Sequence, residues 1–291
     1  MGENREEVVC AQPRPLMSGL FFLEFDMDAR QQRLNVILVP VSLLGALALW
    51  SALSAWGDFP PFILPTPLQV GSRFLETIRD GSLVRHTLVT LSEVVSGLAL
   101  GLGCALVLGY LLAKSERLER LLSPFIIASQ AIPMVAIAPL LIIWLGPGVI
   151  SKVLITALIV FFPILVNIMV GIRSVPRELY DLMQSYQASR WQMLRYLEAP
   201  ATMPVFLGGL RIGATLAVIG AVVGEFVGAD RGLGFLVNLG RGLYDTALVF
   251  VSIFTLIFMA LTLYGIVRWL EIIALGWQES PGSRTHSSSR R

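Results

Sequence analysis

The segment DLMQSYQASRWQMLRYLEAP, residues 181–200, lies between two long apolar runs and is too polar to cross a lipid bilayer. It nevertheless carries a helical pattern. Apolar side chains recur at the spacing of one helix face: Leu179, Leu182, Met183 and Tyr186. The pattern therefore predicts an amphipathic helix outside the membrane, between two membrane spans.

The composition is that of a membrane protein. The chain has 291 residues, of which 55% are hydrophobic and 14% charged, and its mean hydropathy is +0.73. A soluble domain carries about 25% charged residues. We therefore expect an all-α, polytopic membrane bundle with the lipid bilayer as its surroundings and no nucleic acid partner. Cys10 and Cys104 are badly placed to pair, so no disulfide and no metal site are predicted.

Six runs are long and apolar enough to span a bilayer, which takes about 20 residues. They are 34–56, 87–112, 121–145, 149–172, 206–229 and 246–275. This predicts a cytoplasmic tail over residues 1–33, a permease domain over 34–275 and a disordered cytoplasmic tail over 276–291. Residues 67–80 are expected to form a short surface helix.

The positive-inside rule gives the orientation. With the N-terminus in the cytoplasm, 15 Lys and Arg residues fall inside, and six fall outside: Arg73, Arg79, Arg85, Lys152, Arg231 and Arg241. Arg211, near a span end, is not counted. Both termini and residues 173–205 are therefore predicted to be cytoplasmic, in a cell inner-membrane protein.

Prolines interrupt two predicted spans. Pro133 and Pro163 lie near the middle of the third and fourth spans, and Pro139 adds a second break in the third. Gln130 and Asn167 lie within about one turn of these breaks. Freed carbonyls are tolerated mainly where they face protein or a wet cavity. These residues either mark a polar pathway or bend the helices for packing.

Small residues form a continuous face on the fifth span: Gly213, Ala217, Gly220, Gly224 and Gly228. Gly97 and Gly101 do the same on the second span. Such faces let another helix approach closely, which predicts helix–helix interfaces within one subunit or between two.

Two acids lie at apparent membrane depth. Glu93 and Glu225 are candidates for function because buried ionisable groups are costly in a membrane. Both also lie near span ends, where water could reach them. Neither has an obvious basic partner in the sequence.

The segment outside the membrane is predicted to be two helices. Pro176 suits a first helical turn, and Ser189 with Gln192 forms a capping box that starts a second helix at Arg190. The helices separate at Gln187–Ala188, and Pro200 and Pro204 mark the second helix's end. The pair either lies on the lipid headgroups or docks onto a cytoplasmic partner.

This pair resembles the cytoplasmic coupling loop of ATP-binding-cassette (ABC) importer permeases, which reads roughly E-A-A-x-x-x-G and ends at a proline. Asp181, Leu182 and Met183 stand where E-A-A would, Gln187 stands where the glycine would, and Pro200 stands where the final proline would. Three further stretches resemble the nitrate, sulfonate and taurine branch of type I permeases, and also the permeases for thiamine-precursor pyrimidines and riboflavin. They are SQAIPMVAIAPLLIIWLGPG (129–148), FFPILVNIMVGIRSVP (161–176) and AVVGEFVGADRGLGFL (221–236).

The resemblance implies a permease that imports a small solute by alternating access. Its partners would be a second permease copy, a separate ABC ATPase and an external substrate-binding protein. The residues expected to couple to the ATPase are Glu178, Asp181, Leu182, Met183, Tyr186, Gln187, Ala188, Ser189 and Arg190. Those expected along the route or its outer gate are Gln130, Pro133, Pro163, Asn167, Glu225, Gly232 and Gly234. A left-handed backbone at Gln187 would cost about 1–2 kcal/mol relative to glycine.

The sequence lacks the nucleotide-binding motif of an ATPase. No G-x-x-x-x-G-K-[ST] loop is present, and neither Lys114 nor Lys152 follows a glycine. No catalytic residues or cofactor are predicted, and we do not expect an enzyme. Two alternatives remain: a stand-alone ion-coupled transporter that uses Glu225 or Glu93, and a membrane scaffold that transports nothing.

Overall fold

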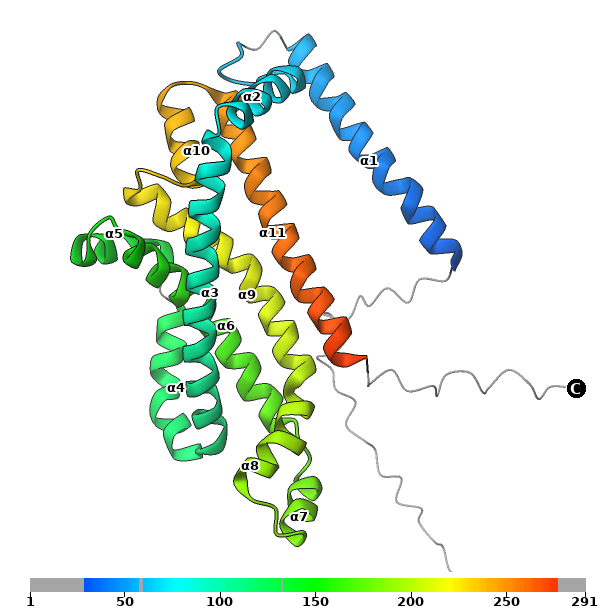
Figure 1. The fold of residues 1–291 in the computed structure, drawn as a ribbon, viewed down its shortest axis with the longest axis vertical. Helices are drawn as coiled ribbons and strands as arrows, with labels where there is room; N and C mark the ends of the chain where they lie inside the picture. Colours follow the sequence, from blue (N-terminus) through cyan, green and yellow to red (C-terminus); the bar gives the residue numbers. More distant parts are fainter. Residues whose placement is uncertain (1–28, 58–59, 132, 277–291) are drawn as a thin grey trace, which may run out of the picture. The chain divides into compact units, whose positions relative to one another are not determined.

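The computed structural model describes residues 29–57, 60–131 and 133–276. Every regular element in those ranges is a helix, which confirms the all-α fold. The chain divides into two units, Met1–Trp56 and Gly57–Arg291. The first contains α1 (Ala29–Trp56). The second contains α2 (Pro67–Arg79), α3 (Ser82–Lys114), α4 (Glu116–Ala131), α5 (Met134–Leu145), α6 (Val149–Arg173), α7 (Arg177–Ser185), α8 (Arg190–Met193), a π-helical turn η1 (Leu194–Glu198), α9 (Ala199–Gly228), α10 (Leu233–Gly242) and α11 (Thr246–Leu275) (Figure 1).

The prediction of six spans is not confirmed in number. In the described part of the chain, four helices are long and apolar enough to cross a membrane: α3, α6, the continuous helix Arg190–Gly228, and α11. The predicted span 121–145 is instead two helices, α4 and α5, bent by 98° at Pro133. Counted as one, this pair gives a fifth crossing, and α1 contributes the shorter apolar stretch Pro40–Trp56.

Two of the expected proline breaks are wrong. Helix α5 runs through Pro139 and α6 runs through Pro163 without interruption. A membrane helix accommodates an internal proline when neighbouring groups satisfy the freed backbone. Only at Pro133, among these three positions, does the helix stop.

The centre of the second unit is α6, which packs against α3 on one side and α9 on the other. Glycines allow both approaches. A Cβ atom at Gly101 on α3 would lie 2.7 Å from the Ala157 carbonyl oxygen of α6, and one at Gly220 on α9 would lie 2.8 Å from the Thr156 Cα atom. The small-residue faces are therefore confirmed as helix–helix interfaces within one subunit.

The helix predicted over 67–80 is present as α2. Thr66 and Gln69 cap each other's backbone N–H groups, which fixes where the helix begins. Arg73 of α2 forms a 2.9 Å ion pair with Asp245, the residue that caps α11. Figure 1 shows α2 and α10 at one end of this unit and α7 with α8 at the other.

Helix α10 was missed by the sequence analysis, because residues 229–245 are rich in glycine and charge. It ends at Gly242, and Tyr244, two residues further on, adopts a left-handed backbone with φ 56°. The Asp245 N–H closes the end by donating to the Gly240 carbonyl at 2.8 Å, the bond of a Schellman motif. Asp245 then caps α11, so the turn between the two helices is tightly specified.

We predict that Gly101→Ala destabilises the bundle. The added methyl group would press on the α6 backbone, and overpacking of this kind costs about 1–3 kcal/mol. The thermal unfolding midpoint of the detergent-solubilised protein should fall. Gly103→Ala is the matched control, because a Cβ at Gly103 has no neighbour within 4 Å. Equal midpoints for the two variants would contradict close packing at Gly101.

Candidate functional site

The two-helix segment forms as expected. Helix α7 ends in a Schellman motif: the Ala188 N–H donates to the Met183 carbonyl at 3.0 Å, and the Gln187 N–H donates to the Gln184 carbonyl at 2.8 Å. Gln187 takes the left-handed backbone that the family glycine would favour, with φ 53°. Gln187 therefore preserves the geometry of the turn in place of the family glycine, and its backbone is strained as a result.

The capping box that starts the second helix is confirmed. The Ser189 side chain accepts from the Gln192 N–H at 3.3 Å, and the Gln192 side chain accepts from the Ser189 N–H at 2.7 Å. These two bonds fix the point at which α8 begins after the turn at Gln187.

The expected end of this second helix at Pro200 and Pro204 is wrong. Helix α8 passes through the π-helical turn η1 into α9, so residues 190–228 form one continuous helix. Within η1 the Ala199 N–H donates to the Leu194 carbonyl, five residues back. Widened turns of this kind are frequent at functional sites. The amphipathic segment is thereby joined to a membrane helix without a flexible linker.

The segment presents apolar and aromatic side chains that nothing in the described chain covers. Leu182 is 52% exposed, Tyr186 79% and Trp191 66%. Glu178, Asp181, Gln187, Ser189 and Arg190 are exposed around them, whereas Met183 and Ala188 are half-buried. The face combines an apolar centre with a charged rim, which is the composition of a protein interface.

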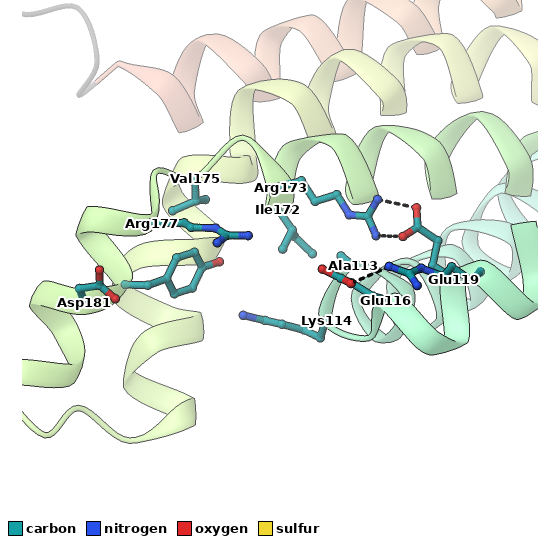
Figure 2. Close-up of a pocket in the computed structure, with 11 residues that line it drawn as sticks. Ala113, Lys114, Glu116, Glu119, Ile172, Arg173, Val175, Arg177 and Asp181 are labelled. Atoms are coloured by element: carbon teal, nitrogen blue, oxygen red, sulfur yellow. Dashed lines mark hydrogen bonds and ion pairs between the residues drawn. The ribbon is translucent and has the colours of Figure 1, made fainter.

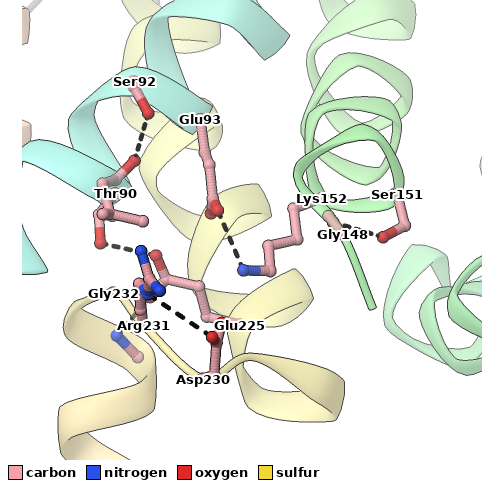
Figure 3. A network of polar contacts seen from close by, with 12 residues as sticks. Thr90, Ser92, Glu93, Gly148, Ser151, Lys152, Glu225, Asp230, Arg231 and Gly232 are labelled. Atoms are coloured by element: carbon pink, nitrogen blue, oxygen red, sulfur yellow. Dashed lines mark hydrogen bonds and ion pairs between the residues drawn. The ribbon is translucent and has the colours of Figure 1, made fainter. Parts of the chain in front are cut away.

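A buried polar cluster lies at the other end of the bundle, where three side chains hold the N-terminus of α10. The His86 Nδ1 accepts from the Gly232 N–H at 2.9 Å, and the Thr90 hydroxyl accepts from the Leu233 N–H at 2.8 Å. The Glu225 carboxylate accepts from the Gly234 N–H and from the Thr90 hydroxyl, the latter at 2.6 Å (Figure 3). The N–H groups of the N-cap residue Gly232 and of the first two residues of α10 thus all have partners from α3 or α9.

The close contact with Glu225 requires glycine at positions 232 and 234. A Cβ atom at Gly232 or Gly234 would overlap the Glu225 side chain. Gly232 also has φ 116°, a backbone that residues with a side chain rarely adopt. The sequence RGLG therefore begins a helix whose start fits closely around a buried carboxylate.

Glu93 has a basic partner after all. Lys152 Nζ lies 3.1 Å from Glu93 Oε1, and the two side chains are 4% and 0% exposed. Figure 3 shows them meeting across the space between α3 and α6. Lys152, which was counted as an outer charge, is thus buried in the first turn of α6. Among the residues that the structure describes, none forms a hydrogen bond with Glu93 Oε2.

The residues expected along the route do not all come together. Glu225, Gly232 and Gly234 form one cluster. Gln130 and Pro133 are exposed near the α4–α5 bend. Asn167, half-buried against Gly209 of α9, donates to the Pro163 carbonyl of its own helix at 2.8 Å.

Sequence reasoning missed His86, Thr90 and Lys152. A signal was present, since His86, Thr90 and Glu93 follow the i, i+4, i+7 spacing of one helix face. All three are buried on α3. Lys152 gave no comparable signal, because its partner lies 59 residues away in the chain.

A bundle of apolar helices, with an amphipathic pair at one end and a capped short helix at the other, is the architecture of a polytopic membrane protein. Residues 101–272 match the family described as binding-protein-dependent transport system inner membrane component. The chain belongs to this family, so it is the permease subunit of an ABC importer. A permease of this family works with an ABC ATPase and a substrate-binding protein. The stand-alone ion-coupled transporter and the passive scaffold are thereby excluded.

Several named permeases are similar to this chain over most of its length. The chain is 50% identical to the riboflavin transport system permease protein RibX of Chloroflexus aurantiacus, over 83% of this chain and 90% of the relative. It is 37% identical to the formylaminopyrimidine transport permease protein ThiX of Halalkalibacterium halodurans, over 75% and 87%. A putative aliphatic sulfonates permease, SsuC of Bacillus subtilis, is 31% identical over 84% and 87%.

The fold is also similar to a solved structure. An inward-facing MetNI methionine ABC transporter chain superimposes with a TM-score of 0.61 at 18% identity, over 67% of this chain and 97% of that one. At this level of identity the likeness concerns the fold alone.

We predict that Thr90→Val loosens α10. Valine keeps the shape of the side chain but removes a hydroxyl that serves both Leu233 and Glu225, and each buried group left unsatisfied costs about 1–3 kcal/mol. Hydrogen–deuterium exchange across residues 229–245 should accelerate. Thr87→Val is the control, because the Thr87 hydroxyl donates within its own helix, to the Leu83 carbonyl. Unchanged exchange in Thr90→Val would show that the cap does not hold α10.

Proposed function

We propose that this chain is the membrane subunit of an importer for riboflavin or a closely related flat heteroaromatic compound. The observation that carries the proposal is the 50% identity to the riboflavin permease RibX over 83% of this chain. The sulfonate permease SsuC, at 31%, supports the anion alternative less well.

The charges within the membrane helices favour an uncharged solute. Lys152 is paired with Glu93 at 3.1 Å, and Arg211 of α9 is paired with Glu271 of α11 at 3.3 Å. A site for nitrate, taurine or a sulfonate would gain from a basic side chain that is free to face the anion. Neither of these two cations is free in that sense.

We further propose that two copies of the permease assemble with ATPase subunits on separate chains. The absence of a phosphate-binding loop in the sequence supports a separate motor. The exposed face of Leu182, Tyr186 and Trp191 supports docking of the ATPase at α7 and α8. In this arrangement both chain termini are cytoplasmic, as the distribution of Lys and Arg favours.

The outer end of the route is proposed to lie at α10. Its start, with Gly232, Gly234 and Glu225, is held by hydrogen bonds from two different membrane helices. An element held in this way can move only if several buried bonds break or shift together. We propose that Gln130, Pro133, Pro163 and Asn167 line the route further in.

The substrate proposal is tested by uptake. The chain should be expressed with its ATPase and binding protein in a riboflavin auxotroph that has no riboflavin transporter of its own. We expect growth on limiting riboflavin and saturable uptake of labelled riboflavin, with no competition from taurine or an alkanesulfonate. Growth and uptake equal to the empty-vector strain would disprove riboflavin as the substrate, and competition by the sulfonate would favour an anion instead.

We predict that Leu182→Asp uncouples the permease from its ATPase. A charge placed in the apolar centre of the docking face should weaken the interface by about 2 kcal/mol, the level of an interface hot spot. Co-purification of the ATPase and uptake should both fall. Gln184→Asp adds the same charge to the same helix but away from that face, and should be far milder. Equal behaviour of the two variants would argue against docking through Leu182.

A further inference from the structure

A third buried acid, in addition to Glu93 and Glu225, lies at the α7 end of the bundle and pairs with a lysine. Glu198, in the π-helical turn η1, is 2% exposed, and its Oε1 forms an ion pair with the Lys114 ammonium. Its other oxygen, Oε2, has no hydrogen-bond partner within the described part of the chain. Lys114 is thus the partner on which this buried carboxylate depends, although the two residues lie 84 positions apart.

Lys114 also contacts the other coupling helix. Its ammonium lies 4.8 Å from the centre of the Tyr180 ring on α7, within the range of a cation–π interaction. Burial raises the pKa of the Tyr180 hydroxyl, and the negative charge of Glu198 raises it further. The ammonium, the ring and the carboxylate therefore form one cluster that joins three separate elements.

The position of Lys114 would allow this cluster to transmit motion to α3. Lys114 is the last residue of α3, and the chain leaves helical geometry at Ser115 before α4 begins. Figure 2 shows its side chain reaching from α3 toward the coupling segment, across a cavity of about 820 Å³. At its opposite end α3 carries His86 and Thr90, which hold the start of α10.

We propose that Lys114 is a positioning residue for transport: it fastens the cytoplasmic end of α3 to both α7 and η1, so that displacement of the docked coupling helices is passed to α3. This inference rests on the proposed docking of an ATPase at α7 and α8. It adds a role for three residues outside the coupling segment's exposed face, namely Lys114, Tyr180 and Glu198.

The decisive variant is the double change Lys114→Met with Glu198→Gln. Lys114→Met alone would leave a buried carboxylate unpaired and could fail to fold, whereas the double variant removes both charges and retains the packing. The complete importer, consisting of permease, ATPase and binding protein, is reconstituted in proteoliposomes. Riboflavin uptake and ATP hydrolysis are then measured in the same vesicles.

For the double variant we expect the unfolding midpoint and the amount of co-purified ATPase to match wild type. Stimulation of ATP hydrolysis by riboflavin-loaded binding protein, and the riboflavin taken up per ATP, should each fall by at least about fivefold, the lower end of usual coupling between sites. Lys114→Arg, which keeps the charge, should retain most of the coupling. Arg120→Met, which removes the exposed pair Arg120–Glu116, should match wild type.

The outcomes separate this inference from the function on which it rests. A double variant that folds, binds the ATPase and couples as well as wild type overturns the role of Lys114. An equal loss of coupling in Arg120→Met also overturns this role. The loss would then follow from removing any charge near the end of α3, and not from removing the contacts of Lys114 in particular. A wild-type permease that binds no ATPase overturns the proposed function itself.

Discussion

The structure depends on the close packing of α6 between α3 and α9. Gly97, Gly101 and Gly109 on α3 bring that helix against α6, and Gly209, Gly213 and Gly220 on α9 do the same from the other side. Lipid tails are as apolar as leucine, so helices in a membrane gain stability from close contact more than from burial. The three helices therefore form a rigid group, and motion within it requires one helix to shift as a body.

Buried carboxylates and their lysine partners then link the helices of this group near each end. Toward the α10 end Glu93 pairs with Lys152, and toward the α7 end Glu198 pairs with Lys114. Removing Lys152 would leave the buried Glu93 carboxylate uncompensated, which costs about 3–5 kcal/mol. The Glu198–Lys114 pair is worth less, because solvent reaches the lysine and screens the interaction. Each pair joins elements that the glycine faces alone would leave free to slide. With 33 residues and a rise of about 1.5 Å per residue, α3 places its two ends about 50 Å apart.

Much of this architecture could be predicted from the sequence, because hydropathy and capping are local signals. The spans followed from apolar runs, and the start of α8 followed from Ser189 and Gln192. The partners of Glu93 and Glu225 could not be predicted, since they lie on other helices. The continuation of the helix through Pro200 was missed for another reason. A proline argues against a helix interior, but η1 widens the turn before it. Similarly, α10 starts in a glycine-rich stretch whose sequence resembles a loop. Its helical start depends on contacts with Glu225, which the local sequence does not reveal.

Helix α10 is held by acceptors on two helices that the ATPase would move differently. Glu225 belongs to α9, which continues without a break from α8, whereas His86 and Thr90 belong to α3, which contacts the coupling segment through Lys114. A push on α8 therefore reaches Glu225 along one continuous helix, but reaches Thr90 through a side-chain contact. Any difference between these two displacements would act on the Thr90–Glu225 hydrogen bond and on the N–H groups of α10 that the pair shares. The start of α10 is thus the point at which motion of the α7–α8 segment would reach the opposite end of the bundle.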